Sequence, residues 1–230
     1  RDEREMWIPR ETIEKAFMHV PMESLRGYRA MCAVDLSVRD DFSALTFLVY
    51  TPSRVPEGRT KVCPFHAITH YFFPEGMLAT HVNRELYKRW ADDGYLTLCK
   101  GDSIDYPLIV DTILRQPLST LKIGYDPYKA LEFTNLLRST PQVGKANLEA
   151  IPQTNGSFNT AVMSFELALS QDSITFDPNP ITAYCFGNAV IDEDRLENRK
   201  PVKAVASDKI DGAITCLMGF WLFNHFKTIV

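Results

Sequence analysis

Residues 30–50 read AMCAVDLSVRDDFSALTFLVY, and this stretch decides the fold. One apolar run covers residues 30–34 and ends in Asp35, and a second covers residues 44–50 and is rich in Leu, Phe and Val. The segment between them, residues 36–42, is short and mostly polar. Two such runs joined by a short polar connection predict a β-hairpin of buried strands, with Asp35 at the end of the first strand.

The sequence after this hairpin predicts a mixed sheet. Residues 67–73 are rich in aromatic and β-branched side chains and predict a third strand, which completes a meander. Short apolar runs then alternate with helical patterns, with strands expected at 96–98, 121–125, 148–151, 189–191 and 202–206, and helices at 81–90, 107–115, 128–138, 158–169, 179–186 and 208–226. Ser207-Asp208 is the expected N-cap of the last helix. This order predicts an α/β domain with a mixed β-sheet flanked by helices.

Length and composition narrow the class of protein. The 230 residues suit one ordinary to large domain or two small ones. With 45% hydrophobic and 23% charged residues, the chain has enough apolar material for a core and is not of a disordered class. A net charge of −4 argues against a uniformly basic nucleic-acid binder, but leaves open an enzyme that reaches DNA through metal ions and a local basic strip.

Several classes are excluded by missing motifs. The five cysteines are scattered and form no C-x-x-C pair, which argues against a disulfide framework or a zinc site. No apolar run reaches the roughly 18 residues of a membrane span, and no leader sequence is visible, so we expect no membrane contact and no secretion. Gly144-Lys145 lacks the rest of a phosphate-binding loop, and no G-x-G-x-x-G occurs, so a nucleotide-binding enzyme is not expected.

Three aspartates are expected near the carboxyl ends of the strands, where sheets of this kind bind their ligands. Asp35 and Asp126 end apolar strands, and Asp211 lies in the first turn of the last helix. Ligands of open α/β sheets bind beyond the carboxyl ends of strands, and an all-oxygen cluster suits Mg²⁺ or Mn²⁺ rather than zinc. Two such ions can promote phosphodiester hydrolysis. Each aspartate taken alone is also explained as a turn, cap or helix-dipole residue.

A basic segment and two histidines are further candidates, each with a structural alternative. The segment 195–203 is either a DNA-backbone contact, through Arg195, Arg199, Lys200 and Lys203, or a solvated turn. Lys129, Arg138 and Lys145 are candidates for the same surface. His66 and His70 lie too far apart along one strand to act together, so we interpret them as structural or surface residues.

Four short motifs resemble one protein family. Residues 33–37 (AVDLS) with 40–45 (DDFSAL) resemble the opening of the nuclease domain of the tailed-bacteriophage terminase large subunit family. Residues 124–128 (GYDPY) resemble its second acidic motif. The C-terminal stretch of the family is similar in order and spacing to residues 179–180, 185–190, 200–203 and 208–213. The resemblance runs from about Tyr28 to the end of the chain.

The resemblance implies a fold, an activity and a set of site residues. It implies an RNase H-like fold and a metal-dependent endonuclease that cuts concatemeric viral DNA during genome packaging. The expected cofactor is Mg²⁺ or Mn²⁺, as two ions. Asp35, Asp126 and Asp211 take the catalytic and metal-binding roles by this resemblance, with Asp41 and Asp208 as alternative or supporting ligands.

The resemblance also implies a domain layout and partners. Residues 1–27 are expected to be a lead-in segment from a missing N-terminal ATPase region, and 28–230 the nuclease domain. The start at Arg1, without an initiator Met, leads us to expect a fragment of a longer protein. Double-stranded DNA is the expected substrate, and the full-length protein is expected to contact the portal and the small terminase subunit in the host cell cytoplasm.

Two rival functions remain open at this stage. The same fold would suit a junction resolvase or a transposase-type nuclease, which would prefer branched or end-specific DNA. The chain could instead be a catalytically silent module that docks DNA or a motor, and that would bind DNA without metal-dependent cleavage.

Overall fold

The central sheet grows from the hairpin at residues 30–50. In the computed structural model, which describes residues 5–37, 41–143 and 147–230, β1 (Arg29–Asp35) pairs antiparallel with β2 (Ser43–Tyr50). β2 pairs antiparallel with β3 (Phe65–Pro74) along its whole length. The predicted meander is therefore confirmed, and Asp35 is the last residue of β1, as expected.

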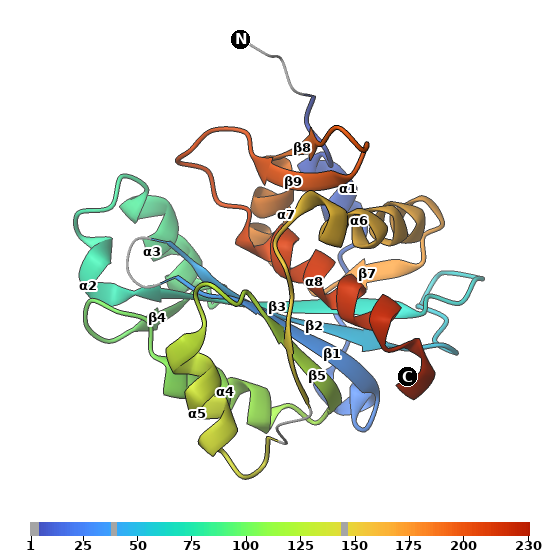
Figure 1. The fold of residues 1–230 in the computed structure, drawn as a ribbon, viewed down its shortest axis with the longest axis horizontal. Helices are drawn as coiled ribbons and strands as arrows, with labels where there is room; N and C mark the ends of the chain where they lie inside the picture. The colour runs from blue at the N-terminus through green and yellow to red at the C-terminus, as the bar shows by residue number, and fades with distance from the viewer. Residues whose placement is uncertain (1–4, 38–40, 144–146) are drawn as a thin grey trace.

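Parallel strands complete the sheet on both sides of the meander (Figure 1). β5 (Ser119–Tyr125) lies parallel to β1, and β6 (Leu148–Ala150) lies parallel to β5. On the other side, β4 (Thr97–Cys99) and β7 (Ile174–Phe176) pair with opposite ends of β3. The order β4-β3-β2-β1-β5-β6 brings the carboxyl ends of β1 and β5 to the same edge of the sheet.

Helices cover both faces of this sheet (Figure 1). Side chains alternate along β1, so that Met31 and Ala33 pack on one face and Cys32 and Val34 on the other. The first face is covered by α6 (Asn155–Ser170), α7 (Pro180–Gly187) and α8 (Asp211–His225), and the second by α4 (Tyr106–Arg115) and α5 (Leu131–Ser139). Burial on both faces explains why the strands are continuous apolar runs.

The remaining elements surround this core. α2 (Glu75–Leu78) and α3 (Arg84–Asp92) follow β3, and a separate two-stranded sheet is formed by β8 (Ala189–Glu193) and β9 (Arg199–Lys203). Short 3₁₀ turns occupy Met22–Leu25 and Lys227–Ile229. A mixed sheet flanked by helices confirms the predicted fold class. Among the residues described, no helix combines the length and apolarity that a membrane crossing requires.

The last helix is buried nearly all round. Every residue of α8 from Asp211 to Phe220 is buried, because this helix lies between the sheet and α6 and α7. The helix begins at Asp211 rather than at the predicted Asp208. The Asp208 carboxylate accepts a hydrogen bond from the backbone N of Val205 (3.0 Å) and so closes the preceding turn instead of capping the helix.

Other predictions needed smaller corrections. The strand β7 was not predicted, because its three residues are too short for a periodic pattern. The lead-in segment contains one short helix, α1 (Arg10–Lys15). Beyond it the chain extends, and Phe17 forms a β-bridge with Phe176. Lys145 and Asp40, which belonged to predicted surfaces and motifs, lie outside the described residues.

The lead-in segment packs on the domain. Ile13 is fully buried, and the Trp7 ring centroid lies 5.5 Å from that of Phe165 in α6. The Trp7 indole N–H also donates to Glu166 Oε1 (2.8 Å). The part of residues 1–27 that the structure describes therefore contributes to the core. Its derivation from an ATPase region stays a prediction.

We expect Ile13→Ala to lower the free energy of unfolding by about 2–4 kcal/mol, the usual range for truncating a fully buried aliphatic side chain. Urea denaturation followed by circular dichroism measures this. Val82→Ala is the matched control, because Val82 is 86% exposed and its truncation should cost no more than about 0.5 kcal/mol. Equal costs for the two variants would show that the lead-in segment is not part of the core.

Candidate metal centre at the ends of β1 and β5

Two carboxylates lie side by side at one edge of the sheet. Asp35 ends β1 and Asp126 directly follows β5, and these strands are parallel neighbours with Val34 opposite Tyr125. Adjacent strands are about 4.8 Å apart, so the two aspartates emerge next to each other. Asp126 is 9% exposed, and its Oδ1 accepts a hydrogen bond from the backbone N of Tyr128 (2.9 Å). That bond fixes the turn that follows the strand.

The third aspartate comes from the helix that covers this edge. Asp211 is the first residue of α8 and is 7% exposed. Within the described part of the chain, its Oδ2 atom is buried and has no hydrogen-bond partner. A buried carboxylate oxygen without a partner is costly, so this atom fits a site that binds a cation.

The charges of these residues act on one another. Burial raises the pKa of Asp35 from 3.8 to about 6; the ammonium group of Lys129 opposes this rise, and the charges of Asp126 and Asp41 add to it. Burial also raises the pKa of Asp211 well above its ordinary value, and Asp35 and Asp41 raise it further. Asp35 thus interacts with both Asp126 and Asp211, and we call the surroundings of these three carboxylates the acidic region. A divalent cation there would relieve the repulsion between them.

The three carboxylates are not arranged as a ready-made metal-binding cluster. Over residues 5–37, 41–143 and 147–230, no three Asp, Glu, His or Cys side chains are grouped as a metal-binding cluster. The donor chemistry of the three aspartates nevertheless fits a hard cation, because they offer carboxylate oxygens and one of these, Asp211 Oδ2, is buried without a partner. The ligand roles of Asp35, Asp126 and Asp211 stay a prediction.

Asp41 and Asp208, the two alternative or supporting ligands, differ in their surroundings. Both carboxylate oxygens of Asp41 are engaged by ammonium groups, Oδ2 by Lys203 Nζ (3.2 Å) and Oδ1 by Lys209 Nζ (2.9 Å). Asp41 therefore links the β1–β2 connection to β9 and to the segment before α8. Asp208 lies in that segment and is occupied with its own turn. Lys209 was missed from the sequence, although it lies two residues before Asp211 in the same motif.

Two of the four predicted DNA-binding cations face the acidic region. Lys200 Nζ donates to the backbone oxygen of Gln153 (2.5 Å) and lies 4.9 Å from the ring centroid of Phe158. Burial lowers the pKa of Lys200, and the charges of Asp126 and Asp35 offset only part of this. Burial also lowers the pKa of Lys203, but its ion pair with Asp41 outweighs that effect and the net shift is upward.

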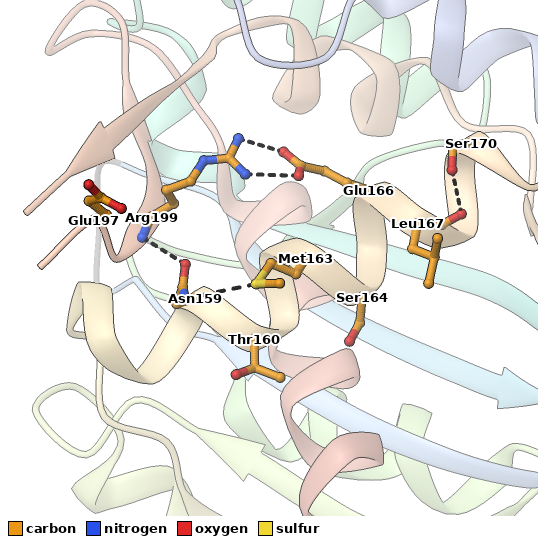
Figure 2. A pocket seen from close by; sticks show the side chains of 9 residues that line it. All are labelled: Asn159, Thr160, Met163, Ser164, Glu166, Leu167, Ser170, Glu197 and Arg199. Atoms are coloured by element: carbon orange, nitrogen blue, oxygen red, sulfur yellow. Dashed lines mark hydrogen bonds and ion pairs between the residues drawn. The ribbon is translucent and has the colours of Figure 1, made fainter.

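The other two cations lie elsewhere on the hairpin. Figure 2 shows the Arg199 guanidinium turned toward α6, where it forms a two-pronged ion pair with Glu166 (2.7 and 2.9 Å). This pair borders a surface groove of about 810 Å³ that is lined mainly by α6 and by none of the three aspartates. Arg195 is exposed in the turn between β8 and β9. Arg138, on α5, donates to Thr134 and Asn135 of the same helix.

The two histidines are interior residues of β3. His66 is fully buried, and its Nδ1 lies 2.8 Å from Thr175 Oγ1. Burial lowers the pKa of His66 to about 3 and that of His70 to about 4. Both rings are therefore neutral at pH 7, in agreement with the structural interpretation.

The fold and the acidic edge together define an RNase H-like domain: an antiparallel meander, parallel strands beside β1, and carboxylates at the ends of β1 and β5 and at the start of α8. A comparison with known protein families narrows this assignment to one family. The chain belongs to the terminase large subunit endonuclease domain family, whose model matches residues 1–226.

Relatives and solved structures agree with this assignment. The chain is 25% identical over 210 residues to the large terminase subunit of Enterobacteria phage HK97 (89% of this chain, 39% of the relative). It is 26% identical over 212 residues to Protein YmfN of Escherichia coli strain K12 (86% and 44%). The chain thus spans less than half the length of these curated relatives.

The fold likeness extends to solved terminases. The crystal structure of the HK97 bacteriophage large terminase superimposes with a TM-score of 0.73 at 21% identity (93% of this chain, 43% of that chain). The large terminase nuclease from thermophilic phage G20c, solved with bound magnesium, gives 0.51 at 7% identity (84% and 80%). At these identities the likeness shows the fold.

The pKa of Asp35 predicts how the stability of the metal-free protein depends on pH. Because the native pKa (about 6) exceeds the ordinary 3.8, the native state binds the proton more tightly than the unfolded state does. This contribution to stability is full below about pH 4 and is lost as pH rises through about 6. Asp35→Asn should therefore raise the free energy of unfolding at pH 7.5 by about 1–2 kcal/mol.

Urea denaturation in EDTA at pH 4 and pH 7.5 measures this difference. The gain should be much smaller at pH 4, where the parent carboxyl is itself largely protonated in the native state. Asp208→Asn is the control, with little expected change at either pH. An Asp35→Asn variant no more stable than the parent at pH 7.5 would refute the electrostatic account.

Proposed function

We propose that this domain is a metal-dependent endodeoxyribonuclease that cuts concatemeric viral DNA during genome packaging. The observation that supports this proposal is the electrostatic interaction of Asp35 with both Asp126 and Asp211 beside the carboxyl ends of β1 and β5, in a chain of the terminase endonuclease family. The G20c nuclease, which shares the fold, was solved with bound magnesium, which supports a divalent cofactor for this chain.

We assign the binding of Mg²⁺ or Mn²⁺, as two ions, to Asp35, Asp126 and Asp211. Such ions supply Lewis-acid activation of water and charge stabilisation at the scissile phosphate. Asp35 is the shared member, because its charge acts on both of the other carboxylates or is acted on by them. Asp126 is oriented by the backbone N of Tyr128, and Asp211 contributes an oxygen that no described protein donor engages.

The lysines of this region have a separate role in the proposal. Lys203 and Lys209 hold Asp41 and so keep it from competing for the ions. Lys200 lies beside the acidic region and retains two further N–H donors, since an ammonium group has three. It can therefore contact a phosphate of the bound strand. Recognition of this kind is mainly of the DNA backbone, and sequence choice would rest with partner proteins.

The wider assignments follow from the family. We propose that residues 1–27 lead from an upstream ATPase region into the nuclease domain at 28–230. In the longer protein, the partners would be the portal and the small terminase subunit, in the cytoplasm of an infected host cell. A junction resolvase or transposase-type activity is less well supported, given the family match over residues 1–226. The cleavage assay distinguishes the proposed nuclease from a catalytically silent docking module, which would bind DNA without metal-dependent cleavage.

The purified domain should nick or degrade plasmid DNA with Mn²⁺ or Mg²⁺, with little sequence preference, and EDTA should abolish this. Asp35→Ala, Asp126→Ala and Asp211→Ala should each slow cleavage by about 100-fold or more, since several kcal/mol of charge stabilisation are lost and each 1.4 kcal/mol is tenfold in rate. Gel assays of supercoiled plasmid follow the rates.

Asp208→Ala is the control for these variants and should cut at close to the parent rate, because Asp208 is engaged in its own turn. A variant of one of the three aspartates that cuts like the parent, with unchanged metal dependence, would remove that residue from the ligand set. DNA binding without any metal-dependent cleavage by the parent would instead establish the silent docking module.

The basic hairpin should contribute DNA affinity through phosphate contacts. Each such contact adds about 0.9 to the slope of log affinity against log salt, so Arg195→Ala with Lys200→Ala should flatten the slope by up to about 2. Lys203 is left intact, because its removal would release Asp41. Fluorescence anisotropy across a salt series, with Ca²⁺ in place of Mg²⁺, measures the slope.

The matched control is Arg84→Ala with Lys88→Ala, which removes two exposed cations from α3 and should leave the slope as in the parent. Arg199→Ala alone is expected to change the slope little, since Arg199 is paired with Glu166. An unchanged slope in the Arg195 and Lys200 double variant would assign the segment to a solvated turn.

A further inference from the structure

We propose that a buried chain of three threonine hydroxyls, Thr69–Thr46–Thr215, sets the position of Asp211 relative to Asp35. These threonines are positioning residues, since their hydroxyls bond to one another and to the start of α8. The inference rests on the proposed function, because it concerns the placement of two of the carboxylates assigned to the metal ions.

The hydroxyl chain crosses from the sheet to the helix. Thr69 Oγ1 of β3 lies 2.8 Å from Thr46 Oγ1 of β2, which in turn lies 2.7 Å from Thr215 Oγ1 of α8. Thr215 Oγ1 donates to the backbone oxygen of Asp211 (3.1 Å) and lies 3.3 Å from that of Gly212. All three threonines are at most 8% exposed, so the chain lies in the interior between the sheet and α8.

The direction of the chain follows from the number of protons. A hydroxyl group has one donor hydrogen. If Thr215 donates to the helix carbonyl, it must accept from Thr46, and Thr46 must accept from Thr69. The chain then runs one way, from β3 through β2 into the backbone of Asp211, and hydrogen bonds aligned in this way strengthen one another in a low-dielectric interior.

A second contact, between Gly212 and Tyr71, fixes the start of α8 against the sheet. A Cβ atom at position 212 would overlap the hydroxyl of Tyr71, so only glycine lets the helix start approach β3 this closely. Tyr71 is itself held by α7, because its Oη lies 2.8 Å from Thr182 Oγ1. The backbone at 211–212 is therefore held by the hydroxyl chain and abuts the Tyr71 ring directly.

The strand register connects this anchor to Asp35. Thr46 of β2 lies opposite Ala33 of β1, two residues before Asp35. The hydroxyl chain thus bonds the helix start that carries one carboxylate to the strand pair that ends in the other. Valine has nearly the shape of threonine and would fill the same space without a polar group to satisfy, so packing alone does not require hydroxyls at these three positions.

The test compares Thr215→Val, which removes the hydroxyl, with Thr215→Ser, which keeps it. Mn²⁺ binding to the metal-free domain is measured by electron paramagnetic resonance titration. Thr215→Val should weaken binding by about 10-fold, the lower end of the range for groups that support metal ligands. The Mn²⁺ affinity of Thr215→Ser should stay within about threefold of that of the parent. The cleavage rate at limiting Mn²⁺ should likewise be lower in Thr215→Val than in Thr215→Ser and the parent.

Thr112→Val is the control for the loss of a helical threonine. Thr112 Oγ1 donates to the backbone oxygen of Leu108 in α4 (2.8 Å), on the opposite face of the sheet, so its loss should leave Mn²⁺ binding unchanged. Thr69→Val removes the far end of the chain without touching α8. It should weaken Mn²⁺ binding in the same direction, and it serves as the test if Thr215→Val does not fold.

Two results would overturn the inference while the metal site stands: Mn²⁺ binding by both valine variants as tight as in the parent, or a Thr215→Ser variant as weak as Thr215→Val. A parent domain that binds no Mn²⁺ would refute the metal centre itself, and the positioning role with it. Weakened binding by Thr215→Val and Thr69→Val, together with recovery in Thr215→Ser, supports the inference.

Discussion

The parallel pairing of β1 with β5 is the constraint on which the acidic edge depends. Because the two strands run the same way and Val34 lies opposite Tyr125, the residues that follow in both strands emerge side by side. This edge therefore holds carboxylates that repel one another, and the packing of the core has to offset that repulsion. Burial of both faces of β1 keeps the strand in register, since a slip by one residue would exchange its two packed faces.

Much of this arrangement could be predicted from the sequence. The hairpin followed from two apolar runs around a short polar segment, and the placement of Asp35 and Asp126 followed from where such runs stop. Local patterns suffice there, because a strand buried on both faces is written as a continuous apolar run. The same patterns predicted that His66 and His70 are structural or surface residues, and His66 is fully buried.

Features set by distant partners could not be predicted in this way. Asp208 has the residue type of an N-cap, yet its carboxylate turns back to Val205, so the helix starts later. Arg199 belongs to a basic segment, but its partner Glu166 lies 33 residues earlier on α6. The threonines at 46, 69 and 215 carry no motif, and only the packing of α8 on the sheet brings their hydroxyls together.

The burial of α8 on all sides has a mechanical consequence. A helix with no solvent-facing side along its first two-thirds has no direction in which to slide or turn without repacking two layers at once. Asp211, at the start of this helix, is therefore held in place by the packing on both sides of α8. A substitution in the first two-thirds of α8 must therefore suit both layers that pack on it, whereas the exposed positions of α3 and α6 carry no such double requirement.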